Sequence, residues 1–155
     1  MKMNKKIVWI AVVACLILAA HPLFAQDDLL NSIGALGAGY MYTSYLAIGA
    51  VADGHYFEVY DDETTMQLME EIKGIANGTS NSLLQLLENE NLAIEDFNFI
   101  NEMIATLGLL FQEAESYQEY VQTGEDREAT LYDNYRNNAW AKITDLLGIE
   151  EQTEE

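Results

Sequence analysis

Residues 94–124 read IEDFNFINEMIATLGLLFQEAESYQEYVQTG, and this stretch decides the fold. It opens with Glu95 and Asp96, which suit the N-terminus of a helix because they complement the helix dipole. Gly124 follows at the other end, in the position where glycine commonly terminates a helix. Between these ends, apolar residues recur at spacings of three and four: Phe97, Ile100, Ile104, Leu107, Phe111, Ala114, Tyr117 and Val121. The pattern predicts one long amphipathic helix, whose apolar stripe needs partners.

Helical spacing continues on both sides of this segment. Residues 126–147 are predicted to form a helix that stops at Gly148, with a stripe of Leu131, Tyr135, Ala139, Ile143 and Leu146. Residues 61–88 form another, which opens with acids and has the stripe Met66, Met69, Ile72, Ala76, Thr79, Leu83 and Leu86. Asn77-Gly78 reads locally as a turn, so two shorter helices are the alternative there. Because the stripe keeps its phase, we expect one helix, weakened or kinked near Gly78.

Residues 28–52 make up a fourth helical segment of a different kind. No charged residue lies between Leu29 and Ala52, and glycine and alanine are frequent. A membrane span is one interpretation. We favour a central helix buried by its neighbours, because Tyr40, Tyr42 and Tyr45 lie in the middle of the run, whereas tyrosines of spanning helices prefer the interfaces. Glycines are unfavourable in a helix unless they allow close approach.

These four segments predict an all-α protein that folds as an antiparallel four-helix bundle over residues 26–148. The predicted links are short, which favours antiparallel neighbours. Residues 149–155 are expected to be a frayed acidic tail. About 130 residues suffice for one domain with a single core.

The N-terminus has the plan of a secretory signal peptide. Lys2, Lys5 and Lys6 precede an apolar run from Ile7 to Ala20, and Ala25 provides a small residue at the cut. We expect residues 1–25 to be removed near Ala25-Gln26 and the mature protein to be periplasmic or secreted. An uncleaved anchor and lipoprotein processing at Cys15 are the alternatives.

Charge narrows the range of partners. Residues 26–155 contain all 26 acidic residues and 4 basic ones (Lys73, Arg127, Arg136 and Lys142), a formal charge of −22. Such a field repels phosphate backbones and anionic membranes, so no nucleic-acid partner is expected and membrane binding is disfavoured once the signal has been removed. The mature chain would contain no cysteine, which rules out thiol catalysis, zinc-thiolate sites and disulfide bonds.

Catalytic constellations are scarce. His55 is the only histidine after position 25, which excludes the paired Glu-x-x-His sites of diiron bundles and zinc sites with several histidines. We therefore expect no enzyme activity, no catalytic residues and no cofactor. The densest polar segment, 53–63, supplies the candidate metal ligands Asp53, His55, Glu58, Asp61 and Asp62. A solvated loop that caps the next helix is the favoured interpretation of this segment, because the spacing is not that of an EF-hand.

The function expected from these features is that of an exported, acidic helical bundle of unknown specific role, acting by binding rather than by catalysis. Its partner would be a protein or a small apolar ligand, for which the tyrosines of the bundle could line a cavity between helices. The alternative is a membrane-associated accessory protein that uses the uncharged helix 29–52. The same helix could also join two copies of the chain as a homo-oligomer.

Overall fold

The computed structural model describes residues 32–88 and 92–149. The predicted signal peptide with its cleavage site, Cys15 and nearly all of the acidic tail lie outside the described residues. The chain divides at Ala35 into two units, and the second, from Leu36 onward, contains the packed helices. Of the first unit only residues 32–35 are described, and they are helical.

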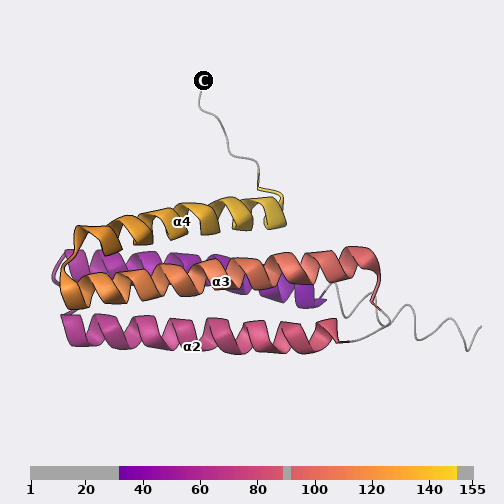
Figure 1. The fold of residues 1–155 in the computed structure, drawn as a ribbon, viewed down its shortest axis with the longest axis horizontal. Coiled ribbons are helices and arrows are strands. Elements are labelled where there is room, and N and C mark those ends of the chain that lie inside the picture. The colour runs from indigo at the N-terminus through magenta and orange to yellow at the C-terminus, as the bar shows by residue number, and fades with distance from the viewer. Residues whose placement is uncertain (1–31, 89–91, 150–155) are drawn as a thin grey trace, which may run out of the picture. The chain divides into compact units, whose positions relative to one another are not determined.

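All regular secondary structure in the described residues is helical. A first helix covers residues 32–56, followed by α2 (Asp62–Leu87), α3 (Ile94–Thr123) and α4 (Asp126–Leu147). Figure 1 shows successive helices running in opposite directions, and α3 packs against both α2 and α4. The predicted all-α four-helix bundle is confirmed for this part of the chain.

The helix ends follow local rules. Asp61 is the N-cap of α2, where its Oδ1 accepts a hydrogen bond from the Thr64 amide at 2.9 Å. Gly124 and Gly148 close α3 and α4 in the left-handed conformation, with φ of 69° and 62°. α2 runs unbroken through Gly78, so the single-helix prediction is correct and the two-helix alternative is wrong.

The core lies along α3. Its members include methionines and branched residues from all four helices, together with alanines that allow close approach: Met41, Ile48, Met69, Ala76, Ile100, Met103, Leu107, Leu110, Ala114, Ala139 and Ile143. The buried face of α3 differs from the predicted stripe. Met103 and Leu110, which lie outside the stripe, are buried, whereas Phe97, which belongs to it, is 41% exposed. A helix with several neighbours buries more than one stripe.

The first helix differs from its prediction in two ways. It continues past Ala52 to residue 56 rather than ending there, and the amide of Phe57 still bonds to the carbonyl of Asp53. It is also not wrapped on all sides, since Leu36 and Leu46 are 76% and 48% exposed. No helix among the described residues has the length and apolar character needed to cross a membrane.

Candidate functional site

The turn between the first helix and α2 exposes a cluster of apolar side chains. Tyr56, Phe57, Val59 and Tyr60 are 79%, 70%, 70% and 37% exposed. The rings of Tyr56 and Phe57 meet edge to face, with centroids 5.1 Å apart. We call these four residues, with Glu58 between them, the aromatic turn. Four exposed apolar side chains within five residues form a candidate interaction surface.

The backbone of the aromatic turn is fixed by hydrogen bonds rather than free. The amides of Val59 and Tyr60 both donate to the carbonyl of Gly54, at 2.8 and 3.1 Å. The amide of Glu58 donates to the carbonyl of His55 at 3.0 Å, and Glu58 itself adopts a positive φ of 59°. A turn held in this way presents its side chains in one arrangement, which lowers the entropy lost on binding.

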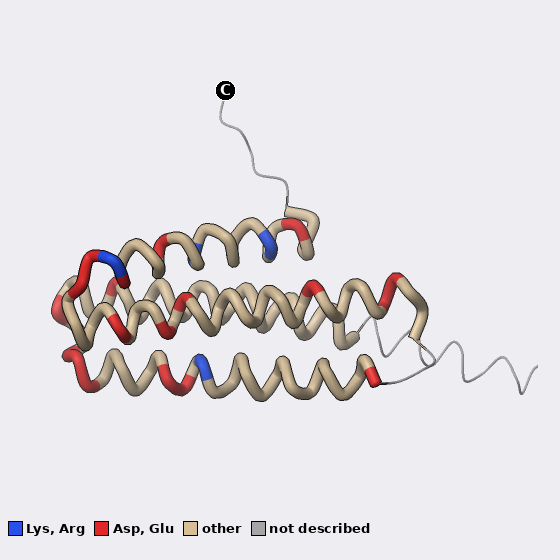
Figure 2. Tube along the Cα trace, in the orientation of Figure 1, with Lys and Arg blue, Asp and Glu red and all other residues tan. Residues whose placement is uncertain are grey.

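Acidic side chains surround the aromatic turn. Asp53, Glu58, Asp61, Asp62 and Glu63 are all exposed. The α3–α4 connection reaches the same end of the bundle and adds Glu125 and Asp126, so that acidic residues gather at this end in Figure 2. The surface is therefore an apolar tip inside a negative rim.

The five candidate metal ligands lie in and beside this turn, but the structure does not assemble them into a metal centre. Asp61 caps α2, and the hydrogen bond from Thr64 lowers the pKa of its carboxyl group. Asp62 bonds to His55, while Asp53 and Glu58 are exposed. Over residues 32–88 and 92–149, no three His, Cys, Asp or Glu side chains are grouped so that they could hold a metal ion.

His55 ties the turn to the bundle. Its Nε2 lies 3.0 Å from Oδ1 of Asp62 on α2, and its Nδ1 lies 3.1 Å from the hydroxyl of Tyr117 on α3. That hydroxyl also donates to the carbonyl of Ala52 at 2.9 Å. The imidazole thus links the segments on both sides of the turn with α3.

Behind His55, tyrosine rings pack against one another instead of lining an open cavity. The ring of Tyr117 lies 4.9 Å from that of Tyr132 and 5.9 Å from that of Tyr120, measured between centroids. Burial raises the pKa of Tyr117 to about 12 and raises the pKa of Tyr132 as well. These phenols keep their protons at neutral pH, and their rings fill space in the bundle.

A buried ion pair lies one helical turn away from Tyr117. Glu113 is fully buried on α3, and its Oε1 accepts a hydrogen bond from Nη1 of Arg136 on α4 at 2.7 Å. The guanidinium stacks on the ring of Tyr45 at 4.1 Å and also donates to the carbonyl of that residue. A Cβ atom at Gly49 would lie 2.5 Å from the guanidinium of Arg136. Glycine at this position therefore lets the guanidinium pack closely against the first helix.

The second oxygen of Glu113 has no hydrogen-bond partner. Burial raises the pKa of Glu113 to about 7, although the hydrogen bond and the charge of Arg136 act in the opposite direction. The ion pair, with Tyr45, therefore joins the first helix, α3 and α4, and its carboxyl group at Glu113 binds a proton near neutral pH. Sequence reasoning missed it, although the spacing offered a signal: Glu113 lies four residues before Tyr117 and Arg136 three residues before Ala139, one turn from members of the apolar stripes.

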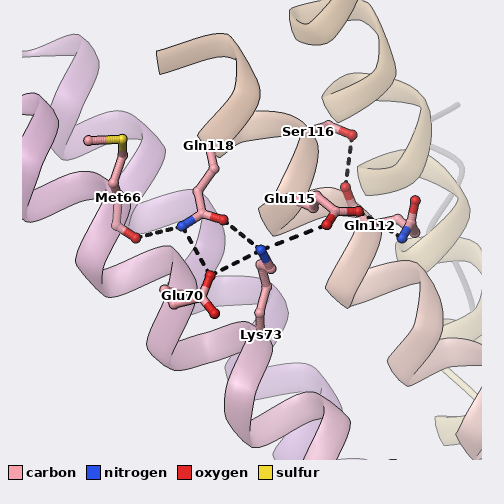
Figure 3. A network of polar contacts seen from close by, with 7 residues as sticks. All are labelled: Met66, Glu70, Lys73, Gln112, Glu115, Ser116 and Gln118. Atoms are coloured by element: carbon pink, nitrogen blue, oxygen red, sulfur yellow. Dashed lines mark hydrogen bonds and ion pairs between the residues drawn. The ribbon is translucent and has the colours of Figure 1, made fainter. Parts of the chain in front are cut away.

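A second polar network joins α2 to α3 (Figure 3). Nζ of Lys73 donates to Glu70 at 3.1 Å and to Gln118 at 2.7 Å, and lies 3.8 Å from Glu115. Nε2 of Gln118 donates in turn to the carbonyl of Met66 at 2.7 Å. The hydrogen bond from Lys73 lowers the pKa of Glu70. Lys73, Arg136 and Lys142 each form an ion pair with an acidic residue of α3. Three of the few basic residues of the chain thus take part in contacts between helices.

One groove between helices could admit a small molecule. It has a volume of about 320 Å³ and is lined by Ala76, Asn77 and Ser80 of α2 and by Leu107, Gly108, Phe111 and Gln112 of α3. None of the predicted tyrosines contributes to it. The groove is open to solvent and contains no charged side chain, which leaves the aromatic turn as the more distinctive feature.

Comparisons with known proteins give no relative: no protein family, no curated protein and no solved structure matches this chain.

Proposed function

We propose that the chain, exported and trimmed near Ala25-Gln26, is a non-catalytic binding protein that docks a partner polypeptide through its aromatic turn. The observation that supports this proposal is the exposure of Tyr56, Phe57 and Val59 on a backbone that is already fixed. Aromatic side chains on a rigid turn bury a large area at low entropic cost, which is the character of binding hot spots.

The charge around the turn defines the chemistry of the partner. The exposed acids Asp53, Glu58 and Asp62 flank the apolar tip. Phosphate backbones and anionic membranes would be repelled, because both carry the same sign of charge. The complementary surface is an apolar pocket with lysine or arginine at its edge, and electrostatic attraction would speed its association. We therefore propose that the partner is a basic protein or peptide.

A synthetic amphipathic helix of leucine and lysine is a suitable probe for this surface. We expect the 26–155 chain to bind it, with an affinity that falls as salt concentration rises. Phe57→Ser and Val59→Ser should each weaken binding about tenfold or more, as expected for hot-spot residues. The matched control is Ile75→Ser, which removes a 57% exposed apolar side chain from α2 and should leave binding unchanged. Unchanged affinity in all three variants would mean that the peptide binds the acidic surface without using the turn, and it would refute the proposal.

A second candidate function, membrane association through residues 29–52, is favoured by the exposed face of the first helix. Leu36, Tyr42 and Leu46 are 76%, 37% and 48% exposed there, and no charge lies near them in the sequence. Fractionation separates the two functions: mature protein recovered without detergent supports the first, and recovery only from the membrane fraction supports the second. Mass spectrometry of the same sample tests the export proposal through its N-terminal residue.

A further inference from the structure

The three hydrogen bonds around His55 can be satisfied together by only one arrangement of protons on its ring. Tyr117 has a single hydroxyl proton, and the carbonyl oxygen of Ala52, 2.9 Å away, can only accept it. The hydroxyl oxygen must then accept a proton from Nδ1 of His55, 3.1 Å away. At the other side of the ring, the carboxylate of Asp62 is also an acceptor, so Nε2 must donate as well.

All three hydrogen bonds can therefore exist together only when both ring nitrogens carry protons. A neutral imidazole has one proton, and its second nitrogen is an acceptor. If that proton stays on Nε2, then Tyr117 must turn its hydroxyl either to the imidazole or to Ala52, and one bond is lost. If it stays on Nδ1, then Nε2 and the carboxylate of Asp62 face each other as two acceptors. Loss of one proton thus removes one link in either tautomer.

The links in question hold the aromatic turn at both of its ends. His55 lies in the last turn of the first helix, directly before Tyr56, Asp62 begins α2 two residues after Tyr60, and Tyr117 belongs to α3. The carbonyl of His55 also accepts the Glu58 amide within the turn. A change in the bonding of this one ring reaches the segments on both sides of the exposed side chains.

Other titratable groups face this cluster from each neighbouring element. Asp62 lies on α2, Tyr117 and Tyr120 on α3, and Tyr132 on α4 stacks on the Tyr117 ring. Asp53 lies two residues before His55 on the first helix itself. Burial keeps Tyr117 protonated well above neutral pH, so it acts as a fixed donor. Glu113, one turn before Tyr117, titrates near pH 7 and must be controlled for separately.

We propose that doubly protonated His55 positions the aromatic turn for docking and that loss of one imidazole proton releases it, so that partner binding weakens as the pH rises through the range in which histidines titrate. This inference rests on the proposed function of the turn. Its direction is distinctive, because deprotonation makes the end of the bundle more negative, and electrostatic attraction alone would strengthen binding of a basic peptide at higher pH.

Nuclear magnetic resonance of the 26–155 chain tests the proton count directly. We expect the ¹⁵N signals of the His55 ring to show two protonated nitrogens at pH 5.5 and one at pH 8.5. Relaxation of the amides of residues 57–60 should show a rigid turn at the lower pH and a more mobile one at the higher pH. A single protonated nitrogen at pH 5.5, or equal mobility of the turn at both values, would overturn the inference.

Variants then separate positioning from general stability. His55→Gln removes the titration but keeps one donor and one acceptor, so the mobility of its turn should not change with pH. Glu113→Gln should retain the pH response of the wild type. A response that persists in His55→Gln, or that disappears in Glu113→Gln, would assign the switch to another group and refute the role of His55.

Binding of the leucine–lysine peptide completes the test. The wild type should bind about fivefold more weakly at pH 8.5 than at pH 5.5, which is the factor expected for one typical hydrogen bond. The affinity of the His55→Gln variant for the peptide should not decrease between pH 5.5 and pH 8.5. If the peptide fails to bind at either pH while the turn still loosens, the proposed function fails and the positioning role stands. If the peptide binds and its affinity does not fall at pH 8.5, the inference fails and the binding function stands.

Discussion

Replacing Glu113 by glutamine should change how the stability of the bundle depends on pH. The pKa of Glu113 is about 7 in the folded protein, against an ordinary value of 4.5, because its carboxyl group is buried. Between these values the folded protein holds a proton that the unfolded chain has released. Folding then takes up a proton, and the free energy of unfolding falls as the pH rises. Glutamine is close in shape, can still accept the bond from Arg136, and does not titrate.

The size of the effect follows from the shift. A pKa difference of one unit corresponds to about 1.4 kcal/mol, so the rise from 4.5 to about 7 amounts to about 3 kcal/mol in all. This stabilising contribution is complete below about pH 4.5 and lost above about pH 7. Most of the loss falls between pH 5 and pH 8. We therefore expect Glu113→Gln to match the wild type at pH 5 and to exceed it by about 2 kcal/mol at pH 8.

Urea denaturation followed by circular dichroism at the two pH values measures this difference. All other titratable groups are common to both proteins, so that any contribution they make to the pH dependence cancels in the comparison. The control is Glu119→Gln, the same chemical change at an exposed position of α3, which should follow the wild type at both pH values. If Glu113→Gln instead loses stability at pH 8, then attraction to Arg136 exceeds the cost of burial, and the reasoning is refuted.

Five further substitutions test the packing and the helix ends. Lys73→Ala should destabilise the protein by about 1 to 2 kcal/mol in urea denaturation, because it removes the bonds to Gln118 and Glu70 between α2 and α3, whereas Arg127→Ala, at a 79% exposed side chain, should change stability by less than about 0.5 kcal/mol. Gly78→Ala should raise the melting temperature, since a Cβ there meets no atom within 4 Å and alanine is favoured inside a helix by about 1 kcal/mol, and Gly124→Ala should lower it because of the positive φ; a lower melting temperature for Gly78→Ala would contradict this. Asp61→Ala should reduce the free energy of unfolding by about 1 kcal/mol in urea denaturation, because the N-cap of α2 is lost. An unchanged urea midpoint would show that the cap contributes nothing.

The sequence alone predicted the helices well where their ends are local. α3 and α4 begin and end where the acidic first turns and the closing glycines indicate. The unbroken apolar stripe predicted one helix through Asn77-Gly78, and this prediction was correct. Burial of Ala76 and Leu83 on one face stabilises the helix more than one glycine weakens it. These features depend on residues only a few positions apart, so they can be read from the sequence.

The candidate site was predicted in part. Residues 53–63 were singled out for their polar side chains, and that segment does contain the turn and its acidic rim. The property that distinguishes this segment, however, is the exposure of its apolar residues, which the run Tyr56-Phe57-Glu58-Val59-Tyr60 does not reveal by itself. Whether such side chains are buried depends on the elements that lie beside them.

What the sequence by itself determined is therefore three amphipathic helices and one uncharged helix, an acidic composition and the scarcity of groups for catalysis. Tertiary structure alone decided that α3 packs against both α2 and α4 and that Arg136 meets both Glu113 and Tyr45. It also decided that His55 lies between Asp62 and Tyr117. The reason is physical: periodicity and capping act within a few residues of the chain, whereas burial and pairing arise only when segments distant in sequence come into contact.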